Sequence, residues 1–295
     1  MKRRTTITLL SALLCLVGCD KSNTSHPDHG KIALTMDWSA CANGIDLPTV
    51  FIFRAGDYTA TISNTSDRLD HLFEPGAYRI RIYNTPEHIS VSGATVTVGE
   101  ASGNMEGTGK FVREMPGWFF SCVKDTVIEK DREYELTAVM QQQVGQLTLQ
   151  IEPTGGMADK IERIEGYLSG VASTLNMDDG THAVPLNVAL EFTKVTDGAN
   201  AGKWAATVRL LGVAGSGQKL HAQIYFEDNT PKPVTLTDAD GSEGCVLTEA
   251  LADFNKDKKT PLALGGKIVE TPTSAGFTAT ITDWTPVKGG SVVAN

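Results

Sequence analysis

The sequence predicts an all-β protein built from two tandem antiparallel β-sandwich domains, and three observations lead to this fold class. Apolar and polar residues alternate with a period of two over most of the chain, which is typical of strands with one buried face. Turn signals separate these runs at intervals of about 8–12 residues. The sequence shows no sustained alternation of strands with helices, the pattern that builds a parallel α/β sheet.

In the first half, the alternation is clearest from Ile32 to Trp38, where every second residue is large and apolar. In the strand expected over residues 78–82, Arg79 and Arg81 alternate with apolar neighbours and should face water. Further strands are expected over residues 49–54, 58–62, 89–98, 118–123 and 134–140, with the glycine-rich residues 99–110 as a loop.

The second half repeats this pattern, with strands expected over residues 144–151, 186–192, 204–210, 220–226 and 276–284. A helix is expected from Leu247 to Phe254, where apolar residues follow helical spacing, and a helical turn around residues 157–165. We expect an N-terminal sandwich over residues 31–143 and a C-terminal sandwich over residues 144–295. The segment from Tyr134 to Ile151 reads as nearly continuous extended chain across this boundary.

The charge balance argues against one class of partner. The 295 residues carry 26 Lys and Arg against 35 Asp and Glu, a formal net charge of −9. Nucleic-acid binding needs a dense basic surface, so we expect no nucleic-acid partner. No apolar run reaches the roughly 18–20 residues of a membrane-spanning helix.

The N-terminus carries a secretory signal. Lys2, Arg3 and Arg4 precede the short apolar stretch 7–17. The stretch ends in Leu-Val-Gly-Cys at residues 16–19, which resembles the bacterial lipobox. That resemblance implies that the sulfur of Cys19 receives diacylglycerol and that a peptidase cuts before it. Residues 1–18 are then a lipoprotein signal peptide, and residues 19–30 a lipidated tether on an outer-membrane or surface protein. The alternative is that Cys19 merely falls near a conventional cleavage site.

The remaining cysteines point to no metal or redox site. Cys41, Cys122 and Cys245 form no CxxC pair, and no His lies at metal-ligand spacing. A disulfide between Cys41 and Cys122 stays open as an alternative, whereas buried free thiols are the favoured interpretation.

No catalytic motif stands out, so we expect no enzyme activity, no catalytic residue, no cofactor and no metal. The sequence has no GxSxG nucleophile elbow. Residues 253–257 match the acidic positions of a calcium loop, but Lys258 stands where the sharp turn needs Gly and Leu264 where a bidentate Glu belongs. Residues 238–243 have the composition of a calcium loop, but their Asp-Gly pair is equally typical of an ordinary turn.

The adjacent aromatic residues Trp118, Phe119 and Phe120 have the composition of a platform on which sugar rings stack. In a strand, at least one of three successive side chains points away from the core. We expect that both faces of this strand are covered instead.

Three segments give the chain a family resemblance. They are residues 73–84, which contain a Pro-Gly-Ala-Tyr entry to a strand; residues 138–151, a strand that crosses between halves; and residues 261–264 with 276–284, a C-terminal strand with its Trp. Together with the lipobox and tether, they make the chain similar to the fimbrillin superfamily of Bacteroidetes, which includes lipid-anchored fimbrial anchors and minor components. The resemblance implies transthyretin-like sandwich domains and assembly into surface fimbriae (pili) by strand exchange, the physics of β-augmentation.

The resemblance also frames the role of the chain within a fimbrium. Stalk subunits of that superfamily lose an N-terminal strand to an arginine-specific protease, whereas an anchor keeps its lipidated N-terminus. Arg54 is one conceivable cleavage point, but we interpret it as an ordinary strand-end arginine. We therefore expect a cell-adhesion role as a fimbrial anchor or accessory subunit, with fimbrial subunits and the membrane as partners. The alternative is a glycan-binding outer-membrane lipoprotein of a polysaccharide-uptake system, which a row of exposed Trp or Tyr would favour.

Overall fold

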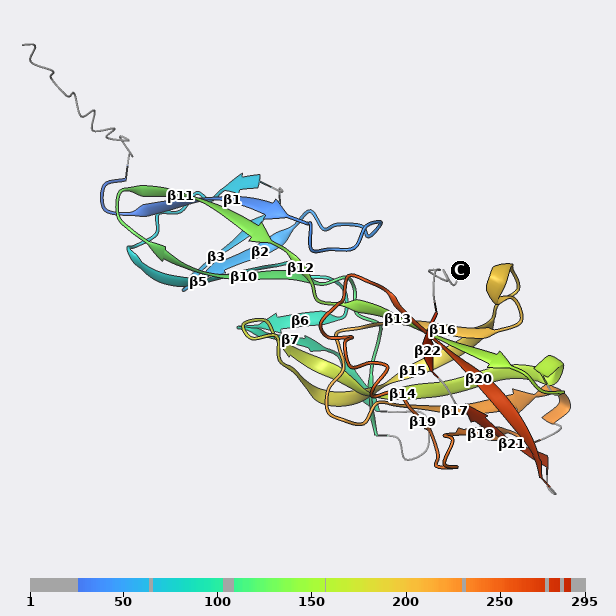
Figure 1. Cartoon of the computed structure of the whole chain (residues 1–295). Helices are drawn as coiled ribbons and strands as arrows, with labels where there is room; N and C mark the ends of the chain where they lie inside the picture. The colour runs from blue at the N-terminus through green and yellow to red at the C-terminus, as the bar shows by residue number, and fades with distance from the viewer. Residues whose placement is uncertain are drawn as a thin grey trace, which may run out of the picture.

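A computed structural model describes residues 26–63, 66–102, 109–156, 158–229, 232–273, 276–281 and 284–287 (Figure 1). Within these ranges the chain forms 22 strands and three one-turn 3-10 helices, over residues 158–160, 198–200 and 227–229. The expected all-β class is confirmed. Figure 1 shows the strands gathered in two groups along an elongated molecule.

The first group consists of two sheets that enclose one apolar core. Alternation explains the core, because Ile32, Leu34 and Met36 of one strand are 0%, 2% and 7% exposed while the intervening Thr35 is exposed. The three-stranded sheet has the order β11-β1-β4 and the five-stranded sheet the order β12-β10-β5-β2-β3. Their bounds are β1 (Gly30–Asp37), β2 (Phe51–Ala55), β3 (Tyr58–Ile62), β4 (Ser66–Arg68), β5 (Gly76–Tyr83), β10 (Phe120–Ile128), β11 (Arg132–Val139) and β12 (Gln141–Gln142).

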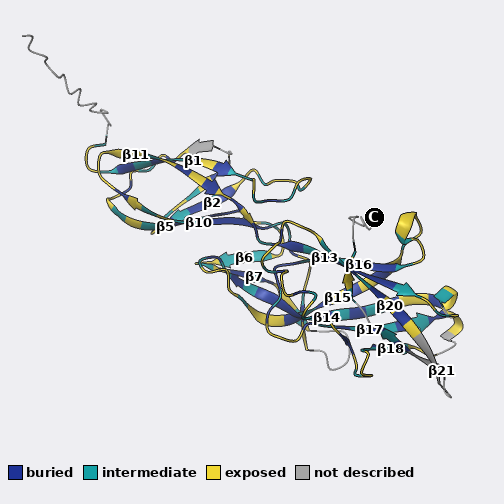
Figure 2. Cartoon of the chain, in the orientation of Figure 1, coloured by how far each residue is buried: buried dark blue, intermediate teal, exposed yellow. Residues whose placement is uncertain are grey.

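The second group is a 14-stranded sheet in which eight strands close on themselves. The ring runs β14-β17-β18-β21-β20-β13-β16-β15 and returns to β14, around the largest core. Leu147, Leu149 and Ile151 point into that core and are 0% exposed. Figure 2 shows buried stretches, in dark blue, along the strands of this group. The ring strands are β13 (Gly145–Pro153), β14 (Ile161–Asn176), β15 (His182–Lys194), β16 (Trp204–Leu210), β17 (Lys219–Phe226), β18 (Val234–Thr237), β20 (Leu262–Thr273) and β21 (Gly276–Ile281). The others are β6 (Ile89–Ser92), β7 (Thr95–Val98), β8 (Glu100–Ser102), β9 (Lys110–Val112), β19 (Cys245–Val246) and β22 (Thr285–Pro286).

Strand pairing differs from the expected antiparallel scheme in two respects. Several pairs are parallel, among them β1 with β11, β13 with β20 and β18 with β21. In addition, β7 pairs with β14 and β9 with β15, so a segment of the first half extends the sheet of the second half. The division near residue 144 stays a prediction, and the extended chain expected across it is present as β11, β12 and β13 in close succession.

The helix expected from Leu247 to Phe254 is wrong, because this segment forms consecutive turns. The amide of Leu251 donates to the carbonyl of Leu247, as in an α-helix, but the following amides of Ala252 and Phe254 bond only three residues back. Leu247, Leu251 and Phe254 are 1%, 0% and 4% exposed. The apolar spacing therefore reports the buried side of a series of turns, which shares its three-to-four-residue period with a helix.

The longest strand, β14, was not expected from the sequence. The pairing of β14 with β15 shifts register between Leu168 and Val171, with Gly170 at a φ of +71°. This β-bulge reverses the alternation, so that the buried residues Ile164 and Leu168 are followed by Val171 and Leu175. A sequence pattern of uninterrupted apolar–polar alternation therefore does not reveal a strand that contains a bulge.

A core truncation in β1 tests the packing of the first group. We expect Leu34→Ala to lower the free energy of unfolding by about 2–5 kcal/mol, because it leaves a cavity in a closely packed core. Thr35→Ala, on the exposed face of the same strand, should change it by less than about 0.5 kcal/mol. Urea denaturation of the chain from Asp20 onward measures both values. Equal effects of the two substitutions would contradict the assigned register of β1.

Candidate functional site at the junction of the two strand groups

A third apolar core joins the two strand groups. It is separate from the cores of the two groups, and its buried members come from both halves of the chain. Phe119 belongs to this third core and Phe120 to the core of the first group, because successive side chains point to opposite faces; both are 0% exposed. The expectation that both faces of this aromatic segment are covered is confirmed for Phe119 and Phe120, whereas Trp118 stays partly exposed. The buried members of the junction core are Tyr83, Val96, Val98, Phe119, Val144, Leu175, Met177 and Leu211.

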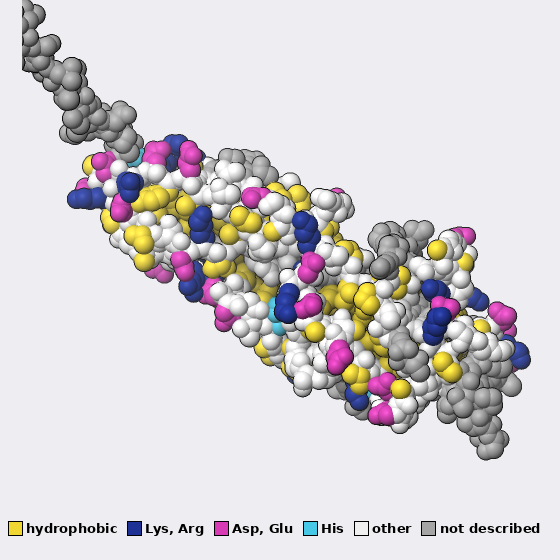
Figure 3. Space-filling view, viewed as in Figure 1, with side chains coloured by type: hydrophobic (Ala, Val, Ile, Leu, Met, Phe, Trp, Pro, Cys, Tyr) yellow, Lys and Arg dark blue, Asp and Glu magenta, His cyan; other side chains and the backbone are white. Residues whose placement is uncertain are grey.

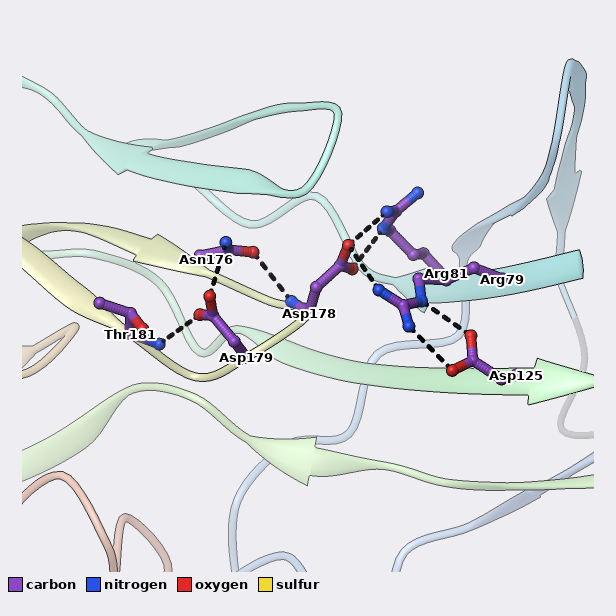
Figure 4. Close-up of polar contacts among 7 residues, drawn as sticks. All are labelled: Arg79, Arg81, Asp125, Asn176, Asp178, Asp179 and Thr181. Atoms are coloured by element: carbon purple, nitrogen blue, oxygen red, sulfur yellow. Dashed lines mark hydrogen bonds and ion pairs between the residues drawn. The ribbon is translucent and has the colours of Figure 1, made fainter.

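An ion-pair cluster ties β5 to the turn between β14 and β15 (Figure 4). Arg81 donates from Nε and Nη2 to the two carboxylate oxygens of Asp178, at 2.7 and 2.6 Å. Arg79 pairs in the same two-pronged way with Asp125 of β10, at 2.7 and 2.8 Å, and reaches Asp178 at 3.4 Å. The hydrogen bonds from Arg81 lower the pKa of Asp178. Asp178 thus stays ionised and links the five-stranded sheet to the closed sheet.

The turn that presents Asp178 is built from its own side chains. The carboxamide of Asn176 accepts the amide of Asp178 at 3.0 Å and donates to Asp179 at 3.1 Å. Asp179 also accepts the amide of Thr181 at 2.8 Å, while Gly180 adopts a φ of +72°. These hydrogen bonds within the turn hold the backbone at Asp178 in place independently of the arginines.

Lys258 forms a second polar link and is only 6% exposed. Its amine donates to the carbonyls of Leu211 and Gln143 and contacts Nε2 of His182 at 3.2 Å. Burial lowers the pKa of Lys258 to about 7. Hydrogen-bond acceptors surround the amine, but no carboxylate is among them, so no opposite charge offsets the cost of burying the ammonium.

His182 and Gln142 complete this network. Burial lowers the pKa of His182 to about 4, and its ring also interacts with the carbonyl of Gly180. Nε2 lies 3.1 Å from the carbonyl of Leu211 as well as 3.2 Å from the amine of Lys258, so it donates to the carbonyl in one neutral tautomer and accepts from the amine in the other. Gln142 donates to the carbonyls of Lys258 and Val144, at 2.6 and 3.0 Å, and accepts the amide of Ala42 at 3.1 Å. The loop after β1 is thereby attached to the second strand group.

A cleft of about 980 Å³ opens beside this network. One wall is the loop 42–46 of the first group, another contains Met115 and Trp118, and the floor is formed by β13, β16 and the loop 258–261. Its lining therefore comes from both strand groups. Figure 3 shows acidic and basic side chains interspersed over one face of the molecule, without a continuous basic patch there.

The residues singled out in the sequence do not converge on one site. Cys19 lies outside the described residues. Cys41, Cys122 and Cys245 are buried free thiols, and burial raises the pKa of Cys41 to about 11 and of Cys245 to about 12. Within the described ranges, no group of three or more His, Cys, Asp or Glu side chains is arranged to hold a metal ion.

The two acidic segments form turns. In one, Asp253 pairs with Lys256 at 2.7 Å, and Asp257 accepts the amides of Lys259 and Thr260, each at 3.0 Å. In the other, Asp240 accepts the amide of Ser242 at 2.8 Å. In the part of the chain that the structure describes, no helix is both long and apolar enough to cross a membrane.

The junction residues were missed at the sequence level for a physical reason. Arg79 and Arg81 lie on the side of β5 away from the first core, but Arg81, expected to face water, has a side chain only 24% exposed because it meets the second strand group. The carboxylate partners of both arginines stand elsewhere in the chain. Asp178 lies 97 residues after Arg81. In the sequence alone, Lys258 stands out only because it replaces the glycine that a calcium-binding loop needs. No local pattern marks a lysine whose burial depends on a distant histidine.

Replacing the carboxylate at the junction tests the ion-pair link. We expect Asp178→Asn to cost about 1–2 kcal/mol of unfolding free energy at pH 7, because it removes charge-assisted hydrogen bonds from a partly buried pair. The folded state holds the pKa of Asp178 below its ordinary value, so this contribution is present above that value and fades as the pH falls through it. Denaturant unfolding at pH 3 and pH 7 measures the difference in unfolding free energy between the wild type and Asp178→Asn at each pH. Asp125→Asn, at a side chain that is 67% exposed, is the control and should cost less.

The buried amine predicts a distinct pH dependence. With a folded pKa of about 7 against an ordinary 10.5, Lys258 binds a proton in the unfolded chain but not in the folded one between those values. Stability should therefore rise with pH in this window, by at most about 1.4 kcal/mol per pH unit from this group. Lys258→Met should abolish the rise, whereas Lys256→Met on the surface should retain it. Parallel pH profiles for wild type and Lys258→Met would contradict the assignment.

Comparison with known proteins identifies the fold and the family. A candidate adhesin of Bacteroides ovatus superposes with a TM-score of 0.56 at 16% identity, covering 88% of this chain and 94% of its own. The fimbrial anchor protein Mfa2 from Porphyromonas gingivalis gives 0.52 at 10% identity, covering 85% and 95%. A candidate adhesin of Bacteroides thetaiotaomicron gives 0.50 at 10% identity, covering 87% and 99%. At these identities the likeness shows a shared fold.

No curated protein sequence matches the chain. The family model of the fimbrillin-A associated anchor proteins Mfa1 and Mfa2, however, matches residues 40–288. This range includes every strand of the two groups except β1, together with the junction between the groups. The chain therefore belongs to the family of fimbrillin-A associated anchor proteins.

Proposed function

We propose that this protein is a surface lipoprotein that acts as a fimbrial anchor or accessory subunit, held in the outer membrane through lipid on Cys19. It has no enzymatic role and engages fimbrial subunits by β-strand complementation. The observation that carries the proposal is the family match over residues 40–288. The lipobox at residues 16–19 supports the membrane attachment.

The position of β1 supports retention of the N-terminus. This strand follows directly on the proposed tether and pairs in parallel with β11 along its full length, from Gly30 with Arg132 to Asp37 with Val139. Its buried side chains Ile32, Leu34 and Met36 fill the core of the first group. Main-chain pairing with alternate side chains in pockets is how a donated strand binds. The chain supplies that strand itself.

The arginine content supports an anchor over a processed stalk subunit. No arginine occurs between Arg4 and Arg54, so an arginine-specific protease has no site in the loop between β1 and β2. Arg54 itself lies inside β2, which is hydrogen-bonded to β3 on one side and to β5 on the other. A peptide bond held in the middle of a sheet does not enter a protease cleft without local unfolding.

Open sheet edges are the proposed sites of subunit contact. Within the described ranges, β3 pairs only with β2, and β11 pairs only with β1. Each therefore leaves main-chain donors and acceptors on its outer side for a partner strand. As part of the same proposal, residues 31–143 and 144–295 are two tandem transthyretin-like sandwich domains, each centred on its own core.

The rival function, glycan capture in a polysaccharide-uptake system, has weaker support. It calls for a row of exposed aromatic rings, but every Trp and Tyr in the described part of the chain is at least partly buried. Trp118 in the junction cleft is a single half-buried ring and makes no row of exposed aromatic residues. We therefore keep the fimbrial role as the proposed function.

Removal of the lipid-bearing thiol tests this function. We expect Cys19→Ala to move the protein from the membrane fraction to the soluble fraction, because without acyl chains nothing else in the proposal holds it to the bilayer. Cys15→Ala, four residues earlier in the apolar stretch, is the matched control and should leave the protein in membranes. Affinity capture from wild-type cells should recover fimbrial subunits in mild detergent. Membrane retention of Cys19→Ala, or capture without any fimbrial subunit, would contradict the proposal.

A further inference from the structure

Arg209 has an unusual environment for a charged side chain. It lies on β16, lines the junction cleft, and has a buried Nε atom without a hydrogen-bond partner. A buried donor without an acceptor destabilises the folded state, most strongly when the group is charged. In addition, no carboxylate among the described residues forms an ion pair with this guanidinium, so its Nη atoms are the donors that an anionic ligand in the cleft would meet. For a guanidinium, the acceptor that matches best is a carboxylate or a phosphate.

Trp118 stands next to this guanidinium, with its ring centroid 5.5 Å from the central carbon of Arg209. The ring is held in place through its backbone. Asn84, which is 5% exposed, donates to the carbonyl of Trp118 and accepts the amide of Phe120, both at 2.8 Å. Before it, Gly117 lies so close to Pro86 that a Cβ atom would approach within 2.8 Å. This wall of the cleft is therefore preformed.

The opposite wall is also fixed. The amide of Ala42 is bound by Gln142, and the amine of Lys259 donates across the junction to the carbonyl of Ser39 at 2.9 Å. Between the walls, the carboxamides of Asn43 and Gln146 are part of the lining. A rigid recess of about 980 Å³ with an aromatic face and a few polar groups has the size and character of a small-ligand site.

The charge of the cleft opposes that of the whole chain. Asp46 is the one acidic side chain among the described residues that line it, against Arg209, Lys258 and Lys259. The amine of Lys258 is turned into the junction, so Arg209 and Lys259 supply the positive charge. In a protein of net charge −9, a recess with this balance favours an anionic ligand.

One strand at the floor of the cleft leaves no edge for an added peptide strand, because β13 is paired on both sides, with β16 and β20. β16 is paired with β15 only at Trp204 and Ala205. Recognition beside Arg209 is therefore tested against an acidic peptide as well as against acidic sugars.

We propose that the junction cleft binds a carboxylate-bearing sugar, such as a uronic or sialic acid unit of a glycan. The carboxylate accepts hydrogen bonds from Arg209, and the apolar face of the sugar ring packs on Trp118. The carboxamides of Asn43 and Gln146 bind ring hydroxyls. This binding site is separate from the open sheet edges that the proposed function assigns to fimbrial subunits.

Matched ligands test the proposal on the intact chain. The probes are trigalacturonate and sialyllactose, each compared with its methyl ester, which keeps the rings and removes the charge. Calorimetry, together with tryptophan fluorescence, measures binding. We expect at least one acid to bind, and to bind at least tenfold more tightly than its ester. Failure of both acids to bind, or equal binding of acid and ester, would overturn the proposal.

A variant pair tests the assigned residue. Arg209→Gln should weaken binding of the acid at least tenfold. Arg163→Gln is the matched control, because Arg163 also lies over an aromatic ring, Tyr225, at 3.7 Å, but on the exposed face of β14. An equal loss in both variants would overturn the role of Arg209. If Arg209→Gln fails to fold, the comparison of acid with ester on the wild-type chain still tests whether the protein recognises the carboxylate. Binding of hexaglutamate with neither sugar bound would instead make the cleft a protein-docking site.

Discussion

Apolar packing between the two strand groups is the constraint on which the other features of the junction depend. Leu175, Met177 and Leu211 of the second half meet Tyr83 and Phe119 of the first half in a core of their own. Each fully buried side chain of this kind contributes about 1.5–3 kcal/mol. By excluding water, the same core strengthens the polar contacts at its rim. The ion pair of Arg81 with Asp178 and the hydrogen bonds of Lys258 would be worth far less if the two groups separated.

Two polar links at the junction act in different pH ranges, and both favour the folded state more strongly as the pH rises. Asp178 is held ionised by Arg81, so its contribution fades only in acid. Lys258 is desolvated, and its contribution grows as the pH rises above about 7. β7, β9, the ion pairs and Gln142 join the two groups through several separate contacts.

Where local pattern and structure disagree, a tertiary contact accounts for the difference. The apolar residues in the turns from Leu247 to Phe254 have helical spacing because their side chains pack into the large core. Most of the backbone hydrogen bonds in these turns, however, join residues three apart rather than four. In β14, the bulge at Gly170 reverses the alternation within one strand. The parallel pairing of β13 with β20 joins segments more than 100 residues apart, and nothing in either segment specifies its partner. In each of these cases the local signal was real but insufficient.

The sequence by itself determined the all-β class, the approximate position of most strands, the covered aromatic faces at Phe119 and Phe120, and the resemblance to fimbrillins. These follow from a period of two and from turn residues, which act over a few neighbouring positions. Only the tertiary structure decided the closed sheet, the third core and the grouping of Trp118 with Arg209. Those depend on which strands pair and on the distances between residues far apart in the chain, and strand periodicity carries no information about either.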